Sequence, residues 1–162
     1  YFKVQRDVNV RGHSYENVIQ SFQKRKLDSK KFIVPQAKYA DLVFSLQPVG
    51  LDPSSELIDD KVNKFKLIVT SKHGYNEYSL RRMLIGLCGL HVDITEDNEA
   101  DKTIMMIEGE ISGADIEIVS KLLCPNIIEF LDSAPKWQDG MMGIMQLITL
   151  THINQALSRK FI

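Results

Sequence analysis

The stretch RDVNVRGHS, at residues 6–14, places two arginines, an aspartate and a glycine directly before a predicted helix. Ser14 is a suitable N-cap because its hydroxyl can accept a hydrogen bond from backbone N–H groups that have no partner in the first helical turn. The residues that follow repeat at helical spacing and predict one apolar face: Tyr15, Val18, Ile19 and Phe22. The stretch therefore predicts a charged turn that opens an amphipathic helix.

The two arginines of this stretch lie five residues apart, at Arg6 and Arg11. On an α-helix they would share a face only loosely, but they can converge if a turn begins near Gly12. Two guanidinium groups aimed at one point form a phosphate site, since the planar fork binds anionic oxygens bidentately and keeps its charge. The alternative is that both arginines are solvated surface charges, and the spacing alone leaves both interpretations open.

The composition is that of an ordinary globular protein, either one compact domain or two small lobes. The chain has 162 residues, of which 44% are hydrophobic and 25% charged, with a formal net charge of −1. The charge is uneven, because residues 1–31 carry a net charge of +5 and the remainder −6. A basic segment on an acidic body indicates a local anion site rather than a nucleic-acid surface, although a basic face that only confers solubility fits as well. We expect no nucleic-acid partner, because the net charge is close to zero, and no membrane partner, because no apolar run is long enough to span a bilayer.

The two cysteines, Cys88 and Cys124, both have apolar neighbours in the sequence. Two distant cysteines form neither a disulfide framework nor a zinc site, so a reducing cytoplasm fits best and both thiols are expected to be buried and unreactive. Residue 1 is tyrosine rather than methionine. We therefore expect the chain to be a fragment whose amino-terminal part is absent.

The pattern of the chain changes across a polar stretch at residues 51–62, which we interpret as a domain boundary. Before it, Val34 is expected to be extended because it precedes a proline, and the apolar run at 41–46 predicts a strand buried on both faces. After it, the patterns predict a small α+β lobe of the order β-α-β-β-α-α. Its expected elements are a strand at 65–70, a helix capped by Ser79 and closed by Gly89, an alternating strand at 90–95, a strand at 102–110, a helix ending at 123, and a helix at 141–157 with Ile144, Leu147, Ile148 and Ile153 inward.

The search for catalytic and metal-binding motifs is mostly negative. The sequence has no phosphate-cradling Gly-x-x-x-x-Gly-Lys-Ser/Thr motif, no Gly-x-Gly-x-x-Gly and no Gly-x-Ser-x-Gly. The four histidines have no metal-ligand spacing, so no metal site is predicted. His13 follows Arg11 and Gly12 and is the histidine that we take as a candidate for substrate contact.

Several motifs in one order resemble the phosphoribulokinase/uridine kinase family, and are most similar to phosphoribulokinases of the cyanobacterial and plant type. They are Arg6-Asp7-x-x-x-Arg11-Gly12-His13-Ser14-x-Glu16, Phe32-Ile33-x-Pro35-Gln36, Ala40-Asp41-Leu42-Val43 and Leu46-x-Pro48. A weaker similarity continues at residues 107–111 and 140–148. The resemblance is specific over residues 3–48.

The resemblance implies an α/β fold in two parts. Residues 1–50 would be the carboxy-terminal portion of a P-loop kinase core, comprising the lid, its helix and the last core strand, and residues 51–162 the α+β lobe. It implies an enzyme that moves the γ-phosphoryl group of ATP, with Mg²⁺, onto a hydroxyl of ribulose 5-phosphate. Arg6 and Arg11 match the phosphate-contacting arginines of the lid and substrate region, and Asp7 would orient an arginine rather than act as a base.

The departures from the family limit this interpretation. The phosphate-cradling loop, its lysine and the catalytic aspartate would lie upstream of residue 1, so this chain alone is expected to be inactive and to bind neither ATP nor Mg²⁺. Plant-type members also carry a regulatory cysteine pair, and Cys88 and Cys124 are too far apart in sequence to match it. A uridine kinase-like enzyme and a non-catalytic regulatory module remain alternatives. The expected partners are the sugar phosphate and ATP, and a homodimer is left open.

Overall fold

The computed structural model describes residues 2–49, 64–72, 77–97, 101–125, 131 and 133–160. These residues form two compact units, one from residues 2–40 and one from residues 41–49 and 64–160. The polar stretch at 51–62 that we predicted as a boundary lies outside the described residues.

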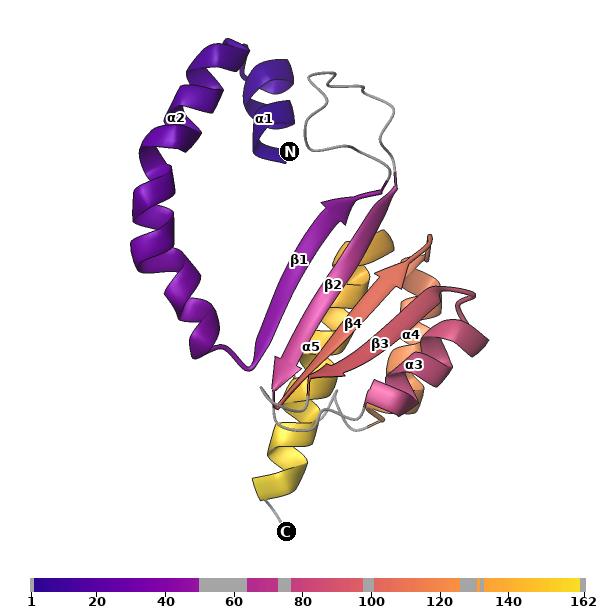
Figure 1. The fold of residues 1–162 in the computed structure, drawn as a ribbon. Helices are drawn as coiled ribbons and strands as arrows, with labels where there is room; N and C mark the ends of the chain where they lie inside the picture. Colours follow the sequence, from indigo (N-terminus) through magenta and orange to yellow (C-terminus); the bar gives the residue numbers. More distant parts are fainter. Residues whose placement is uncertain are drawn as a thin grey trace. The chain divides into compact units, whose positions relative to one another are not determined.

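Every described secondary-structure element of the first unit is a helix or a helical turn (Figure 1). Its elements are α1 (Phe2–Gln5), a π-helical turn (Arg6–Val10), α2 (Tyr15–Asp28), a second π-helical turn (Ser29–Ile33) and a 3₁₀ helix (Val34–Lys38). The predicted start of α2 is confirmed, because the Ser14 hydroxyl accepts a hydrogen bond from the backbone N–H of Asn17 at 3.3 Å.

The extended conformation predicted for Val34 is wrong. Val34 is helical, with φ −55° and ψ −41°, and Pro35 follows it in the first turn of the 3₁₀ helix. A proline is tolerated in a first turn because the N–H group that it lacks would have no partner there. The steric bias against a helical residue before proline is therefore overridden at this site.

The second unit is built on a four-stranded antiparallel sheet with the strand order β1-β2-β4-β3 (Figure 1). The strands are β1 (Leu42–Pro48), β2 (Phe65–Lys72), β3 (His91–Asp97) and β4 (Lys102–Glu108). Leu67 in β2 lies opposite Leu46 in β1 and Ile107 in β4, so apolar residues line up across the sheet. Such cross-strand pairs are the unit of sheet stabilisation.

Strand β1 corrects two predictions. It pairs with β2 and belongs to the second unit, so the compact units divide after residue 40 and not at residue 50. It is also the edge strand of the described sheet and is half-buried along its length, rather than buried on both faces. The polar stretch that suggested a boundary lies, in the sequence, between two paired strands of one sheet. An apolar run identifies a strand, but it does not identify that strand's neighbours.

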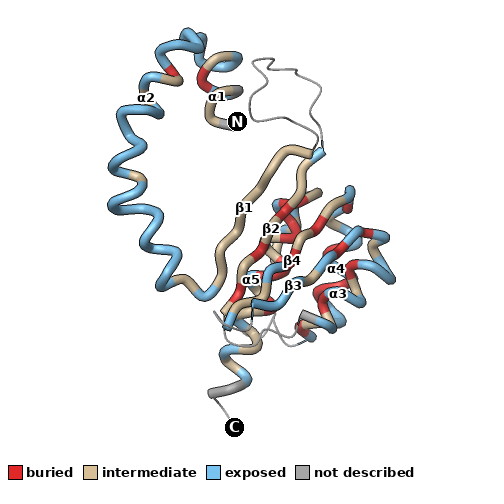
Figure 2. Tube along the Cα trace, viewed as in Figure 1, coloured by how far each residue is buried: buried red, intermediate tan, exposed pale blue. Residues whose placement is uncertain are grey.

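Three helices cover one face of this sheet: α3 (Glu77–Gly86), α4 (Gly113–Leu123) and α5 (Gly140–Lys160). Figure 2 shows the buried residues on the strands and on the helix faces that meet them. The core contains Leu67 and Val69 of β2, Leu80 and Leu84 of α3, Val92 of β3, Met105 and Ile107 of β4, Ile116 and Val119 of α4, and Ile144, Leu147 and Ile148 of α5. Burying aliphatic side chains of this size stabilises a fold by roughly 1.5–3 kcal/mol each.

Most of the predicted elements of this unit are present. Gly89 has a left-handed φ of +65° and its N–H donates to the carbonyl of Ile85, so it closes α3 as predicted. The predicted cap at Ser79 is wrong, because α3 already begins at Glu77. The inward position predicted for Ile153 is also wrong, since this residue is 46% exposed.

The structure confirms the mixed helix and strand content that the sequence predicts. After residue 64 the described elements follow one another as β2, α3, β3, β4, α4 and α5. In the part of the chain that is described, no helix is both long and apolar enough to span a bilayer.

Candidate functional site

The two arginines singled out in the sequence are brought together by a π-helical turn. In an α-helix, residues five positions apart point about 140° away from each other around the axis. Residues 6–10 instead form a wider turn, in which the backbone N–H of Arg11 donates to the carbonyl of Arg6, five residues back, at 3.1 Å. Single π-helical turns are rare in proteins, and those that occur are often found at functional sites.

Both guanidinium groups meet one carboxylate. Nε of Arg6 donates to Oδ1 of Asp7 at 3.1 Å, and Nη1 of Arg11 donates to the same oxygen at 3.2 Å. The Asp7 residue is only 7% exposed, whereas the side chains of Arg6 and Arg11 are 51% and 54% exposed. The carboxylate therefore holds both guanidinium groups, and about half of each arginine side chain is exposed to solvent.

The acid form of Asp7 is disfavoured in this cluster. Burial would by itself raise the pKa of Asp7, but the hydrogen bond from Arg6 and the positive charges of Arg6, Arg11 and Lys3 lower the pKa below its usual value. Asp7 is consequently ionised at neutral pH, and the two arginines with one aspartate carry a net positive charge. The cluster can accept an anion.

Gly12 and His13 end the turn through their backbones. Gly12 has a φ of +68°, in the left-handed region that a residue with a Cβ rarely adopts. The N–H of Gly12 donates to the carbonyl of Val8 at 3.2 Å, and that of His13 to the carbonyl of Asp7 at 2.9 Å. Among the described residues, the imidazole of His13 forms no hydrogen bond with either arginine. The structure thus brings Arg6 and Arg11 together on Asp7, and the predicted substrate contact of His13 stays a prediction.

Replacing Asp7 by asparagine should change how stability depends on pH. Because the pKa of Asp7 is lowered in the folded state, its ionised form stabilises the fold above the unfolded pKa, and this contribution is lost as the pH falls through the folded value. We expect the difference in free energy of unfolding between wild type and Asp7→Asn to be largest above pH ~4 and to shrink towards pH ~2. Urea unfolding of the intact protein across this range measures it.

The matched control for this prediction is Glu16→Gln, which removes an exposed carboxylate that forms no ion pair with the described residues. The difference in free energy of unfolding between wild type and Glu16→Gln should not show the pH dependence expected for Asp7→Asn. If the difference in free energy of unfolding between wild type and Asp7→Asn stays constant from pH 6 to pH 2, the pKa of Asp7 is not lowered in the folded state.

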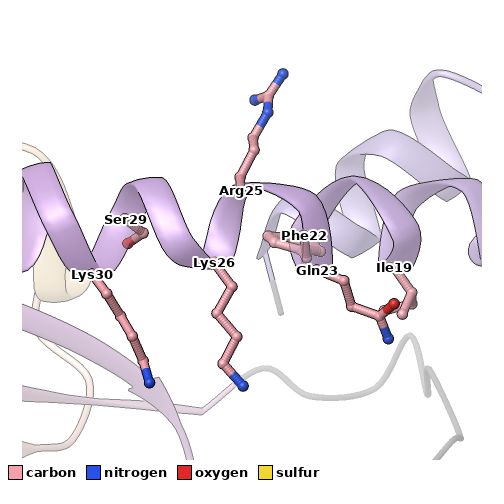
Figure 3. Close-up of a pocket in the computed structure, with 7 residues that line it drawn as sticks. All are labelled: Ile19, Phe22, Gln23, Arg25, Lys26, Ser29 and Lys30. Atoms are coloured by element: carbon pink, nitrogen blue, oxygen red, sulfur yellow. The ribbon is translucent and has the colours of Figure 1, made fainter.

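A second basic feature of this unit is a groove along α2 and the turn after it (Figure 3). It has a volume of about 420 Å³ and is lined by Ile19, Phe22, Gln23, Arg25, Lys26, Ser29 and Lys30. Lys26 and Lys30 point to the same side of the helix and Arg25 to the other (Figure 3). This groove was not predicted from the sequence. Its signal there is the pair Lys26 and Lys30, four residues apart, on the helix that carries Ile19 and Phe22.

The described residues include no group of three or more His, Cys, Asp or Glu side chains that could hold a metal ion. The Arg6–Arg11 cluster suits the phosphate groups of a substrate or nucleotide, and a Mg²⁺ site is not assigned to the described part of the chain. Cys124 is buried and Cys88 half-buried, and both are free thiols. Burial raises the pKa of both cysteines, so neither is an activated nucleophile at neutral pH.

Comparison with known proteins gives a family for the segment that holds the cluster. The sequence profile of the Phosphoribulokinase / Uridine kinase family matches residues 1–51. The chain is 41% identical over 63 residues to the phosphoribulokinase of Synechocystis sp., covering 39% of this chain and 17% of that protein. It is 43% identical over 68 residues to the chloroplastic phosphoribulokinase of Triticum aestivum (42% and 16%), and 40% identical over 78 residues to that of Arabidopsis thaliana (48% and 19%).

The similarity is confined to part of each protein. The chain covers less than a fifth of the length of these curated relatives. The weaker similarity that we noted at residues 107–111 and 140–148 lies outside the segment that the family profile matches. The predicted resemblance is confirmed for the motifs around Arg6 and Arg11. Residues 1–51 of this chain are therefore similar to the phosphoribulokinase/uridine kinase family.

Proposed function

We propose that this chain is part of an ATP-dependent sugar kinase that phosphorylates a hydroxyl of ribulose 5-phosphate, with Arg6 and Arg11 binding a phosphate group. The observation that carries the proposal is the convergence of both guanidinium groups on Oδ1 of Asp7, at 3.1 and 3.2 Å, within a segment that matches the kinase family. The relatives named above are phosphoribulokinases, which favours ribulose 5-phosphate over uridine as the acceptor.

The arrangement suits the binding of an anionic sugar for two reasons. Each guanidinium has five N–H donors and gives one to Asp7, so donors remain for a phosphate. The shared carboxylate also restrains both side chains before the ligand arrives, which lowers the entropy lost on binding. Phosphoryl transfer depends on positioning and positive charge rather than on covalent chemistry, and such a pair supplies both.

The remaining parts of the active site belong, in this proposal, to the rest of the intact protein. The phosphate-cradling loop, the catalytic carboxylate and the Mg²⁺ ligands lie there, and ATP binds there with Mg²⁺. This chain alone is then inactive. The proposed role of residues 1–40 is the lid and its helix, and the second unit would be the lobe that shapes the sugar site.

The burial pattern of the first unit supports its place within a larger core. Among its described residues, only Asp7 and Val18 are buried, while Phe32, Ile33 and Val34 are each more than half exposed. A segment with so little buried apolar surface does not stabilise its own fold. Packing against the body of a kinase would cover these side chains.

The proposal is tested by an assay of the intact protein with ATP and Mg²⁺, coupling ADP formation to NADH oxidation. Ribulose 5-phosphate should support turnover, and uridine at equal concentration should not. Turnover with uridine alone would assign the uridine kinase alternative, and no turnover with either acceptor would favour a regulatory module. We propose the cytoplasm as its location, because both thiols are free and unreactive.

A further inference from the structure

A groove runs along the outer face of α3 in the second unit. It has a volume of about 360 Å³, and its lining residues recur every three or four positions of the helix: Tyr78, Arg81, Arg82, Ile85 and Gly86. Leu80 and Leu84 lie on the opposite face of α3 and are fully buried in the core. The groove therefore follows the face of α3 that the sheet does not cover.

The groove carries two positive charges that the described residues do not neutralise. Arg81 and Arg82 are exposed, and neither forms an ion pair with a described residue. Each guanidinium group has five N–H donors in a planar fork that matches the oxygens of a phosphate. Two such groups in one groove suit a dianion, and a phosphate monoester carries about 1.5 to 2 negative charges at neutral pH.

The other two side chains of the groove supply an apolar surface. Tyr78 and Ile85 are 60% and 43% exposed. The Tyr78 hydroxyl donates to Oε1 of Glu96 in β3 at 2.8 Å, which ties the far end of the ring to the neighbouring strand. A restrained aromatic ring beside an aliphatic side chain gives a flat molecule a surface to pack against.

Gly86 is not explained by packing within the described chain. It lies in the last turn of α3 without a left-handed φ, and no atom lies within 4 Å of the position of a Cβ there. Glycine destabilises a helix relative to alanine, but it is used where a ligand approaches the backbone closely. Gly86 thus keeps open a space that the described residues do not fill.

We propose that the α3 groove binds a small organic phosphate that carries a flat apolar group. The phosphate lies between the guanidinium groups of Arg81 and Arg82, and the flat group packs against Tyr78 and Ile85. A small molecule fits better than a protein partner, because the volume is that of a small ligand pocket and the groove is confined to one helix of 10 residues. The inference does not depend on the proposed kinase activity.

Methyl NMR of the intact protein tests the proposal, with phenyl phosphate as the probe. The δ1 methyl groups of isoleucine are labelled with ¹³C, and the Ile85 signal is identified by its absence in Ile85→Leu. On titration this signal should shift with a dissociation constant of about 1 mM, as expected for so small a ligand. The Ile153 signal, from an exposed position on α5, is the internal control and should not shift. Inorganic phosphate and phenol each carry one half of the probe and should bind at least about fivefold more weakly.

Substitutions in the groove separate its two halves. Arg81→Ala/Arg82→Ala should raise the dissociation constant about tenfold or more, because the charge-assisted hydrogen bonds are lost. The matched control is Lys121→Ala/Lys136→Ala, which removes two exposed positive charges elsewhere in the unit and should leave binding unchanged. Gly86→Ala should weaken binding about threefold or more without destabilising the protein, since the added methyl group occupies the space of the ligand and meets no neighbour.

Three results would overturn the proposal. The first is an Ile85 signal that does not move up to about 20 mM phenyl phosphate. The second is a dissociation constant that is unchanged in either Arg81→Ala/Arg82→Ala or Gly86→Ala. The third is inorganic phosphate or phenol that binds as tightly as phenyl phosphate, because one half of the groove would then take no part.

Discussion

Replacing Arg11 by alanine in the intact protein should lower kcat/KM for ribulose 5-phosphate by about tenfold or more, the size of effect expected for one lost charge-assisted hydrogen bond. The change removes one of the two forks that converge on Asp7, so that the carboxylate is held by Arg6 alone. The positive charge that faces the phosphate falls at the same time. Steady-state kinetics with saturating ATP and varied sugar phosphate measure the effect.

Arg11→Lys separates the role of geometry from the role of charge. Lysine keeps the charge but lacks the planar fork, so it should recover only part of the lost activity. Arg25→Ala is the control, because it removes an exposed arginine of the same unit that forms no ion pair with the described residues. If Arg11→Ala has wild-type kcat and KM while the enzyme phosphorylates ribulose 5-phosphate, the phosphate role of the cluster is wrong and the proposed reaction stands.

Gly143→Ala should strongly destabilise the second unit. A Cβ at Gly143 would overlap the carbonyl oxygen of Gln138 and Cδ1 of Ile116. The neighbouring loop has little freedom to move, since Gln146 accepts from the N–H of Gln138 at 2.9 Å and donates to the carbonyl of Lys136 at 3.2 Å. We expect a loss of about 3 kcal/mol in the free energy of unfolding, at the upper end for overpacking, because a backbone atom must shift.

Gly86→Ala is the matched control for that substitution. Gly86 also lies in a helix, but nothing approaches within 4 Å of the position of its Cβ, so alanine there should be neutral or stabilise the protein by up to about 1 kcal/mol. Urea unfolding of the two variants and the wild type measures the difference. Equal midpoints for Gly143→Ala and the wild type would show that the loop yields, contrary to this account.

The sequence predicted the local features of this fold better than its long-range ones. Ser14 and Gly89 were identified correctly because a cap and a left-handed closing residue depend on a few neighbouring backbone groups. The place of β1 in the second unit could not be predicted, because its residues pair with residues of β2 that lie 17 to 29 positions away in the sequence. The helical conformation at Val34 was missed because the proline that disfavours it also starts the next helical turn.

The candidate site shows the same division. The residue types of Arg6, Asp7 and Arg11 indicated a phosphate site, and the motif identified the family. Their convergence required a π-helical turn, and no simple repeat in the sequence predicts one, because a spacing of five places two residues on different sides of an α-helix. His13 was proposed for substrate contact on its neighbours alone; its backbone N–H closes the turn, and the role of its side chain stays a prediction.

The wide turn at residues 6–10 has a consequence for how this segment can vary between homologous proteins. The turn is closed by backbone groups, and Val10 is largely exposed, so the identity of that side chain is open to change. The number of residues in the turn, by contrast, is fixed. One inserted or deleted residue would rotate Arg11 by about 100° relative to Arg6 and separate the two guanidinium groups. Relatives that keep this anion-binding pair should therefore differ here by substitution and not by length.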